Sequence, residues 1–215
     1  MTEGKYDRRA ERWSEVAYAD AATYLAHRGE IVLSLGPPLE HGDTLLDLAC
    51  GDGGLADHLP GAHYSGVDAS VEMVKAGQVR GRNIVLGDLN DYEPPEPVAA
   101  TTCFRAIYYA DDRPAFFRRV AGYTERKFVF DLNPRQYRVD DIGAEVRAAG
   151  FDQLELRPFF SPQHFSLPRP VANVFYALER SGPIATVTCP VLFGPPQAAR
   201  ETMTRIRPAR LPSVE

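Results

Sequence analysis

The pattern of hydrophobic and polar positions changes near residue 40. Between Asp20 and Gly36-Pro37-Pro38, apolar residues recur at the spacing of one helical face. Asp20 is a suitable N-terminal cap, and the glycine and prolines would end the helix. We therefore predict that residues 1–40 form an N-terminal helical cap.

After residue 40, short apolar runs alternate with segments of helical pattern. Strands are predicted at residues 44–49, 64–67, 83–86, 98–104 and 127–132. Helices are predicted between them, at residues 54–59, 71–79 and 111–122, and from residue 140 to Gly150. Apolar strands that alternate with helices are typical of an α/β fold, in which helices cover both faces of a parallel sheet.

The last third of the chain has a weaker pattern. Residues 153–160 alternate between apolar and polar, as an edge strand does, residues 170–180 suit a helix, and residues 186–193 form a final β-rich run. From Gly194 the chain has four prolines, four arginines and few aliphatic residues. The sequence therefore predicts one domain over residues 41–193 and a flexible tail over residues 194–215.

Composition narrows the classes of function. The net charge of −5 argues against a protein that binds the phosphate backbone of a nucleic acid. No apolar run approaches the length that spans a bilayer, and the first residues have no apolar segment of a secretion signal. The three cysteines indicate no disulfide framework. We expect a cytoplasmic monomer or homodimer with neither a nucleic-acid nor a membrane partner.

A glycine-rich loop carries the most information. The segment from Asp47 to Gly54 (DLACGDGG) directly follows an apolar run and precedes a helical one. Glycines allow the backbone to turn sharply and to approach a ligand closely, and a helix behind them offers free N–H groups. Such a loop suits a nucleotide-like cofactor.

Two aspartates follow the loop at intervals of about twenty residues, the distance expected for an acid that binds a ribose. Asp68 ends the second predicted strand, and Asp88 follows the third. Ligands of open α/β sheets bind at the carboxyl ends of the strands, so we expect Asp47, Asp68 and Asp88 to face one crevice.

The loop alone leaves two interpretations open. Residues 51–56 also fit the G-x-G-x-x-A pattern of dinucleotide-binding proteins, which favours a nicotinamide-dependent oxidoreductase. Asp47 favours the other interpretation, because a carboxylate repels a pyrophosphate but attracts the ammonium group of a methionine-like ligand.

Three segments together resemble the motifs of class I S-adenosylmethionine-dependent methyltransferases: LLDLACGDGGLADHL, YSGVDAS with the following VEM, and VLGDLND. Ala49 stands where that family usually has its first glycine. The resemblance implies a Rossmann-like, seven-stranded, mostly parallel sheet with helices on both faces and an antiparallel C-terminal strand.

The resemblance also implies S-adenosylmethionine as the cofactor. Asp47, Gly51 and Gly53 would line its methionine end, and Asp68 would bind the ribose. Met73 would pack on the adenine, whose amino group Asp88 and the backbone of Leu89 would recognise. The full predicted cofactor-binding set is Asp47, Ala49, Gly51, Gly53, Asp68, Ala69, Met73, Asp88, Leu89 and Phe104.

The methyl acceptor would lie among aromatic and polar residues of the N-terminal segment and of the loops after the later strands. The predicted pocket residues are Trp13, Tyr18, Arg105, Tyr108, Tyr109 and Gln163. Arg105 could hold an acidic or phenolate acceptor, or form a surface salt bridge. His164, with Tyr109 behind it, is the candidate general base if the acceptor is protonated. No metal is expected, because Arg105 stands where a metal-dependent enzyme would have an acid.

The sequence thus predicts methyl transfer from S-adenosylmethionine to an O, N or C nucleophile of a small molecule, mainly by positioning and desolvation. Two alternatives stay open. One is the nicotinamide-dependent oxidoreductase, and the other is a non-catalytic S-adenosylmethionine-binding module.

Overall fold

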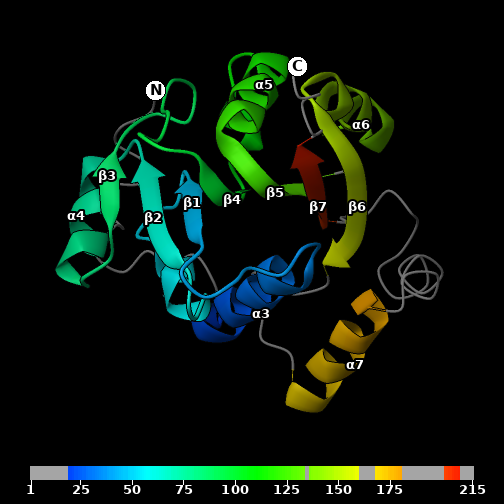
Figure 1. Ribbon diagram of the computed structural model, residues 1–215. Helices are drawn as coiled ribbons and strands as arrows, with labels where there is room; N and C mark the ends of the chain where they lie inside the picture. Colours follow the sequence, from blue (N-terminus) through cyan, green and yellow to red (C-terminus); the bar gives the residue numbers. More distant parts are fainter. Residues whose placement is uncertain (1–18, 134–135, 160–167, 181–200, 209–215) are drawn as a thin grey trace.

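One sheet organises the computed structural model, which describes residues 19–133, 136–159, 168–180 and 201–208 of the chain (Figure 1). Within these residues the strand order is β3-β2-β1-β4-β5-β7-β6. Strands β1 to β5 pair in parallel, whereas β7 pairs antiparallel with both β5 and β6. The strands are β1 Thr44–Leu48, β2 His63–Asp68, β3 Ile84–Leu86, β4 Val98–Cys103, β5 Thr124–Leu132, β6 Phe151–Phe159 and β7 Glu201–Pro208.

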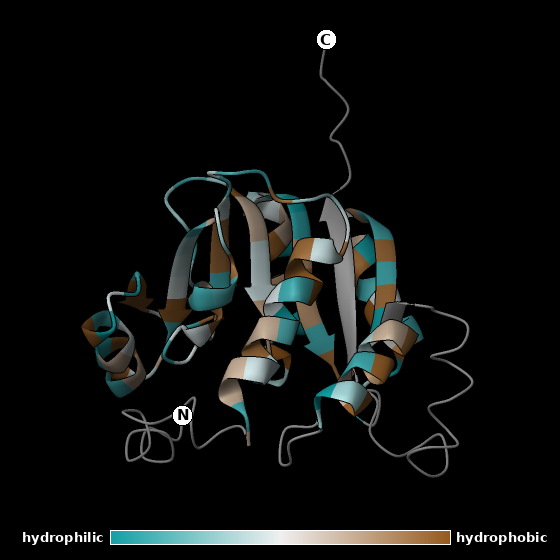
Figure 2. Ribbon diagram, turned by 90° about the horizontal axis from the view of Figure 1, so that it is seen from below, coloured by the Kyte–Doolittle hydropathy of each residue, from teal (hydrophilic) through white to brown (hydrophobic). Residues whose placement is uncertain are grey.

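Helices cover both faces of the sheet, with α5 and α6 on one side and α3 and α7 on the other (Figure 1). Hydrophobic and hydrophilic residues interleave along them, as expected for helices with one buried face (Figure 2). None of the helices in the described ranges is long and apolar enough to cross a membrane. The helices are α3 Ala21–Ser34, η2 Gly54–His58, α4 Val71–Val79, η3 Ile107–Tyr109, α5 Arg113–Tyr123, α6 Val139–Ala148 and α7 Arg169–Arg180.

Each face of the sheet has its own apolar core. Leu46 and Leu48 belong to the core under α5 and α6, and Leu45 belongs to the core under α3. Successive side chains of a strand point to opposite faces, so Asp47 lies on the same face as Leu45. The carboxylate at the end of β1 is therefore directed towards α3.

The predicted parallel α/β arrangement is confirmed over β1 to β5. Asp20 caps α3, because its side chain accepts a hydrogen bond from the backbone N of Thr23 at 3.0 Å. Asp112 caps α5 in the same way through Ala115. Gly150, with φ +105°, follows α6 as predicted for a left-handed C-terminal residue.

Two elements differ from the prediction. The segment after the glycine loop forms only the short 3₁₀ helix η2, because Pro60 disfavours helical geometry at the preceding Leu59. The strand predicted at residues 186–193 lies outside the described residues and stays a prediction, whereas β7 covers Glu201–Pro208, where the sequence predicts no strand. The sheet therefore extends into the segment that the sequence assigned to a flexible tail after residue 193.

A buried lysine fixes α3 to the sheet. Lys127 of β5 has no exposed surface, and its Nζ donates to the carbonyl oxygens of Val32 at 2.5 Å and Leu35 at 3.0 Å. The carbonyls at the C-terminal end of a helix lack partners within the helix and carry partial negative charge. The ammonium group supplies both the donors and the opposite charge, so it holds the C-terminal end of α3 over β5.

Candidate cofactor and acceptor site

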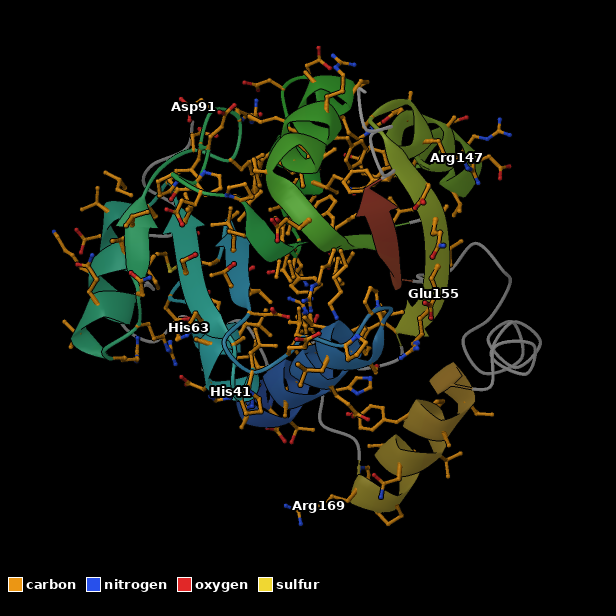
Figure 3. All side chains as sticks on the ribbon, in the orientation of Figure 1. His41, His63, Asp91, Arg147, Glu155 and Arg169 are labelled. Carbon is orange, nitrogen blue, oxygen red and sulfur yellow. The ribbon has the colours of Figure 1, made fainter. Side chains whose placement is uncertain are left out.

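The strand register brings the carboxyl ends of the parallel strands to one edge. Leu48 of β1 lies beside Val67 of β2 and Cys103 of β4, and Val67 in turn lies beside Val85 of β3. In Figure 3, Asp91 lies at this edge, whereas His63 lies at the opposite end of β2. The glycine loop and the predicted aspartates follow the strands at this same carboxyl edge.

The glycine loop has an unusual backbone. Ala49, Gly51 and Gly53 all have positive φ, at +55°, +61° and +71°. Only glycine adopts this left-handed region without steric cost, and a Cβ there costs about 1–2 kcal/mol. The Ala49 departure from the family pattern therefore places one strained residue at the entrance of the loop.

Ion pairs of the buried Asp52 hold the glycine loop in place. Asp52 is 3% exposed and lies within 3.4 Å of Arg82 and 3.3 Å of Arg80. Arg82 also donates to the backbone oxygen of Asp52 at 2.7 Å and to Asp57 at 2.6 Å. Because Asp52 lies between Gly51 and Gly53, these contacts restrain the loop.

Asp68 joins the loop to the end of β2. Its Oδ2 accepts a hydrogen bond from the backbone N of Gly51 at 2.7 Å, and its Oδ1 accepts one from Ser70 at 2.9 Å. Partial burial raises the pKa of this carboxyl, against the effect of the two backbone hydrogen bonds. A carboxylate oxygen can accept more than one hydrogen bond, so Asp68 keeps the capacity to accept from a ribose diol.

Asp47 is held from both neighbouring strands. Its side chain is nearly buried, and it accepts hydrogen bonds from Thr102 Oγ1 at 2.7 Å and Tyr64 Oη at 2.9 Å. Burial raises the pKa of Asp47 to about 6, although the two hydrogen bonds and the positive charge of Arg28 oppose this rise. The carboxyl is therefore ionised at neutral pH and takes up a proton in mildly acidic solution.

Asp88 is linked to the end of the second strand and, through Asn90, to the segment after the fourth strand. The backbone N of Gly87 donates to the carbonyl oxygen of Asp68 at 3.1 Å, which brings Asp88 beside the end of β2. The side-chain amide of Asn90 donates to Asp88 at 3.0 Å and to the carbonyl oxygen of Tyr109 at 3.1 Å. Asn90 also accepts from the backbone N of Asp111 at 2.9 Å, so it connects the loops after β3 and β4.

The other predicted cofactor residues vary in accessibility. Ala69 is exposed directly after Asp68. Met73 is 2% exposed, so its side chain already packs inside the protein and could border an adenine only by its edge. Leu89 and Phe104 are also buried. The carbonyl oxygen of Leu89 accepts a hydrogen bond from Arg119 at 2.9 Å.

The predicted acceptor residues are only partly described. Arg105 is half-buried with φ +56°, and its backbone N donates to Asp131 at 2.5 Å. Tyr108 and Tyr109 are more than two fifths exposed, and their ring centroids are 4.4 Å apart. Four other predicted residues lie outside the described residues: Trp13, Tyr18, Gln163 and His164.

A buried arginine near the acceptor residues was not predicted. Arg28 of α3 is 3% exposed, lies 4.3 Å from the ring centroid of Phe104, and donates to Tyr24 Oη at 2.8 Å. It also pairs with Asp131 of β5 at 3.4 Å. These two residues are far apart in the chain, so no local pattern could have indicated their contact.

The described part of the chain holds no group of three or more histidine, cysteine or acidic residues placed to bind a metal ion.

The residues at the carboxyl edge fit S-adenosylmethionine. The glycines with positive φ give a backbone that a ligand can approach, and Asp68 and Asp88 are partly accessible acceptors beside it. The Asp47 carboxylate carries a negative charge of the kind that an ammonium group would pair with. Only the short η2, Gly54–His58, follows the loop. The helix dipole that the sequence predicts behind the loop therefore contributes little to ligand binding.

Comparison with known proteins gives an independent result. The protein family described as methyltransferase domain matches residues 46–127. Trans-aconitate 2-methyltransferase of Mycobacterium tuberculosis is 33% identical over 104 residues, which are 43% of this chain and 39% of the relative. The enzyme of the same name from Mycolicibacterium gilvum is 29% identical over 116 residues, or 51% and 44% of the two chains. This chain thus matches less than half the length of these curated relatives.

Solved structures share the fold at low sequence identity. An S-adenosylmethionine-dependent methyltransferase from Clostridium acetobutylicum aligns with a TM-score of 0.62 at 14% identity, over 95% of this chain and 99% of that one. Phosphoethanolamine N-methyltransferase 2 of Haemonchus contortus, in complex with S-adenosyl-L-methionine, aligns with a TM-score of 0.63 at 15% identity, over 96% and 59% of the chains.

The family match covers the glycine loop and both later aspartates, and it favours the methyltransferase interpretation of the loop over the dinucleotide one. Residues 46–127 are therefore the part of this chain that is similar to the methyltransferase-domain family and to the curated methyltransferases.

Proposed function

We propose that this protein transfers the methyl group of S-adenosylmethionine to a small organic acid. The main support for the cofactor is a hydrogen bond of 2.7 Å from the backbone N of Gly51 to Asp68, which joins the glycine loop to the end of β2 at the carboxyl edge. In this arrangement Asp47 binds the ammonium group, Asp68 the ribose, and Asp88 with Leu89 the adenine.

The acceptor half of the proposal rests on charge. Arg28 and Arg105 both contact Asp131 at the end of β5, beside the predicted acceptor residues. Arg28 makes this contact through its guanidinium group and Arg105 through its backbone N, and the cationic side chain of Arg105 is the group that would attract an anionic acceptor. The curated relatives are named trans-aconitate 2-methyltransferases, which also favours an acid.

The bound cofactor supplies a methyl group on a sulfonium sulfur, which is already activated for displacement. The chain then has to orient the acceptor oxygen in line with that methyl group and to exclude water. A carboxylate acceptor is deprotonated at neutral pH and needs no general base. For such an acceptor, His164 and Tyr109 would bind or shield the acceptor and would not remove a proton from it, and no metal is needed.

The first experiment tests the cofactor. Thermal unfolding of the purified protein is followed with S-adenosylhomocysteine and with NADH. A ligand that binds only the folded state raises the melting temperature, and the proposal predicts this rise for S-adenosylhomocysteine alone. A rise with NADH alone would contradict the proposal and support the oxidoreductase alternative.

The second experiment tests catalysis. Methyl transfer from radiolabelled S-adenosylmethionine is measured with trans-aconitate, with its trimethyl ester and with a small primary amine. We expect labelled product from the free acid and none from the ester. Product from the amine alone would contradict the acid acceptor. Cofactor binding without transfer to any acceptor, including a cell-extract mixture, would support the non-catalytic binding module.

A further inference from the structure

We infer that Tyr64 is a positioning residue that, together with Thr102, holds the Asp47 carboxylate in the orientation and the charge state that bind the ammonium group of the cofactor. The inference rests on the proposed function and assigns a role to two residues outside the predicted site. Neither side chain is needed to contact the cofactor, because each acts through Asp47.

The two hydrogen bonds come from opposite sides of β1. Asp47 lies beside Thr102 of β4 and Gly66 of β2 in the register of the sheet. Thr102 Oγ1 donates to Asp47 Oδ1 at 2.7 Å, and Tyr64 Oη donates to Asp47 Oδ2 at 2.9 Å. With both oxygens held, the carboxylate cannot rotate freely, and its remaining lone pairs keep a fixed direction.

Gly66 makes the contact from Tyr64 possible. Tyr64 and Gly66 are two residues apart on β2, so they lie on the same face of the sheet. A Cβ at Gly66 would lie 3.0 Å from Tyr64 Oη, 3.2 Å from its ring carbon Cε1 and 2.7 Å from Cys50 Sγ. The space left by the missing side chain is therefore occupied by the tyrosine ring, which lies across the glycine and reaches Asp47.

The charged and titratable groups around Asp47 act in different directions. Arg28 from α3 favours the ionised carboxylate, whereas the charge of Asp68 at the end of β2 disfavours it. Burial and neighbouring carboxylates raise the pKa of the Cys50 and Cys103 thiols, and burial raises that of Tyr64, so these three groups stay neutral. The two hydrogen bonds favour the ionised form of Asp47. Unlike the effect of Arg28 or Asp68, they can be removed by a substitution that removes no charged group.

The consequence is a pH dependence specific to the amino-acid end of the cofactor. Because the pKa of Asp47 is about 6, its carboxylate is protonated in mildly acidic solution and loses its attraction for the ammonium group. Affinity for S-adenosylhomocysteine should then fall about tenfold between pH 7.5 and pH 5. Removing either hydrogen bond should move the midpoint of this fall upwards by about one pH unit.

The experiment measures dissociation constants by calorimetry for two nucleosides between pH 5 and pH 8. S-adenosylhomocysteine carries the amino-acid end, and 5′-methylthioadenosine lacks it. Both contain the ribose that Asp68 would bind, so the ratio of the two affinities removes the titration of Asp68. We expect the ratio to depend on pH in the wild-type protein, and its midpoint to move upwards in Tyr64→Phe and Thr102→Val.

Tyr123→Phe is the matched control. It removes a buried tyrosine hydroxyl from α5, on the other face of the sheet, and should leave the ratio unchanged at every pH. A ratio that does not depend on pH, or a Tyr64→Phe profile identical to the wild-type profile, would overturn the inference. If neither nucleoside binds at any pH, the proposed function fails and the inference fails with it. Thr102→Val keeps the test decisive should Tyr64→Phe not fold.

Discussion

The two sides of the carboxyl edge are built in different ways. On the cofactor side, Asp47, Gly51, Asp68 and Asp88 come from one continuous stretch of the chain. They are held by hydrogen bonds to backbone groups and to the side chains of Tyr64, Asn90 and Thr102. On the proposed acceptor side, the buried guanidinium group of Arg28 on α3 pairs with Asp131 of β5 and lies 5.9 Å from the ring centroid of Phe159 at the end of β6, so the contacts join distant segments of the chain.

The two sides also depend on different interactions for their stability. The cofactor side depends on backbone geometry, because positive φ at the glycines and close approaches between loops leave no room for larger side chains. The acceptor side depends on a buried ion pair. Removal of either partner alone leaves the other charge buried and uncompensated. Substitutions on the cofactor side should therefore affect ligand binding as well as stability, and substitutions on the acceptor side should act mainly on folding.

The largest effect is expected from Arg28→Met. It leaves Asp131 buried without the guanidinium that compensates its charge, which costs about 3–5 kcal/mol of the free energy of unfolding. Denaturant titration would measure the loss. The double variant Arg28→Met with Asp131→Asn removes both charges and should recover much of the stability. A single variant as stable as the wild-type protein would show that the acceptor side does not depend on this pair.

The next effect is a pH dependence of stability on the cofactor side. Burial raises the pKa of Asp47 from its ordinary value of 3.8, which applies in the unfolded chain, to about 6 in the folded protein. The folded state therefore binds the proton more tightly than the unfolded state does. The resulting stabilisation is complete below pH 4 and is lost as the pH rises through 6, and it amounts to about 3 kcal/mol. Subtracting the unfolding free energies of Asp47→Asn from those of the wild-type protein isolates this contribution. A difference that rises with pH over this range would contradict the assignment.

A smaller effect separates backbone strain from packing. Gly53 and Gly81 have nearly equal φ of +71° and +76°, but a Cβ at Gly53 would lie 2.6 Å from Ile84 Cδ1, whereas Gly81 has no atom that close. Replacement by alanine should cost about 1–2 kcal/mol at Gly81 and about 1 kcal/mol more at Gly53. Only Gly53→Ala should also weaken binding of S-adenosylhomocysteine. Equal losses of stability and unchanged binding in both variants would show that the loop tolerates the larger side chain.

The smallest effect is expected from Asn90→Ala. This substitution removes the connection between the loops after β3 and β4 without changing a charge. Each lost hydrogen bond is worth about 0.5–1.5 kcal/mol, so cofactor affinity should fall about threefold to tenfold. Ser34→Ala, which removes a side-chain hydrogen bond to the carbonyl oxygen of Ile31 at the C-terminal end of α3, is the control. Equal affinity in the Asn90 variant would show that the adenine end needs no such link.

The placement of the three aspartates at the carboxyl edge was predictable because its information is local. Each apolar strand runs directly into the residue that should bind the ligand, so Asp47, Asp68 and Asp88 could be placed at one edge from the alternation of strands and helices alone. The strained Ala49 and the link through Asn90 required coordinates, since φ and loop contacts leave no pattern in the sequence. The short η2 could have been anticipated, because Pro60 follows it directly.

The acceptor side and the last strand were not predictable in this way. Arg28 and Asp131 are 103 residues apart, and their contact exists only because Lys127 and the apolar core hold α3 over the sheet. Strand β7 lies in a segment rich in arginine and proline, a composition that favours a solvated tail. Its antiparallel pairing with β5 and β6 supplies backbone partners that no local propensity reveals.

The most direct test of the cofactor side is the affinity for S-adenosylhomocysteine of the Asp68→Ala variant, measured by calorimetry beside the wild-type protein and Asp140→Ala, which removes an exposed carboxylate from α6. Asp68 is the carboxylate that holds Gly51 and faces the proposed ribose position, so its loss should weaken binding at least about tenfold while Asp140→Ala binds normally. Wild-type affinity in a folded Asp68→Ala protein would contradict the proposed cofactor site.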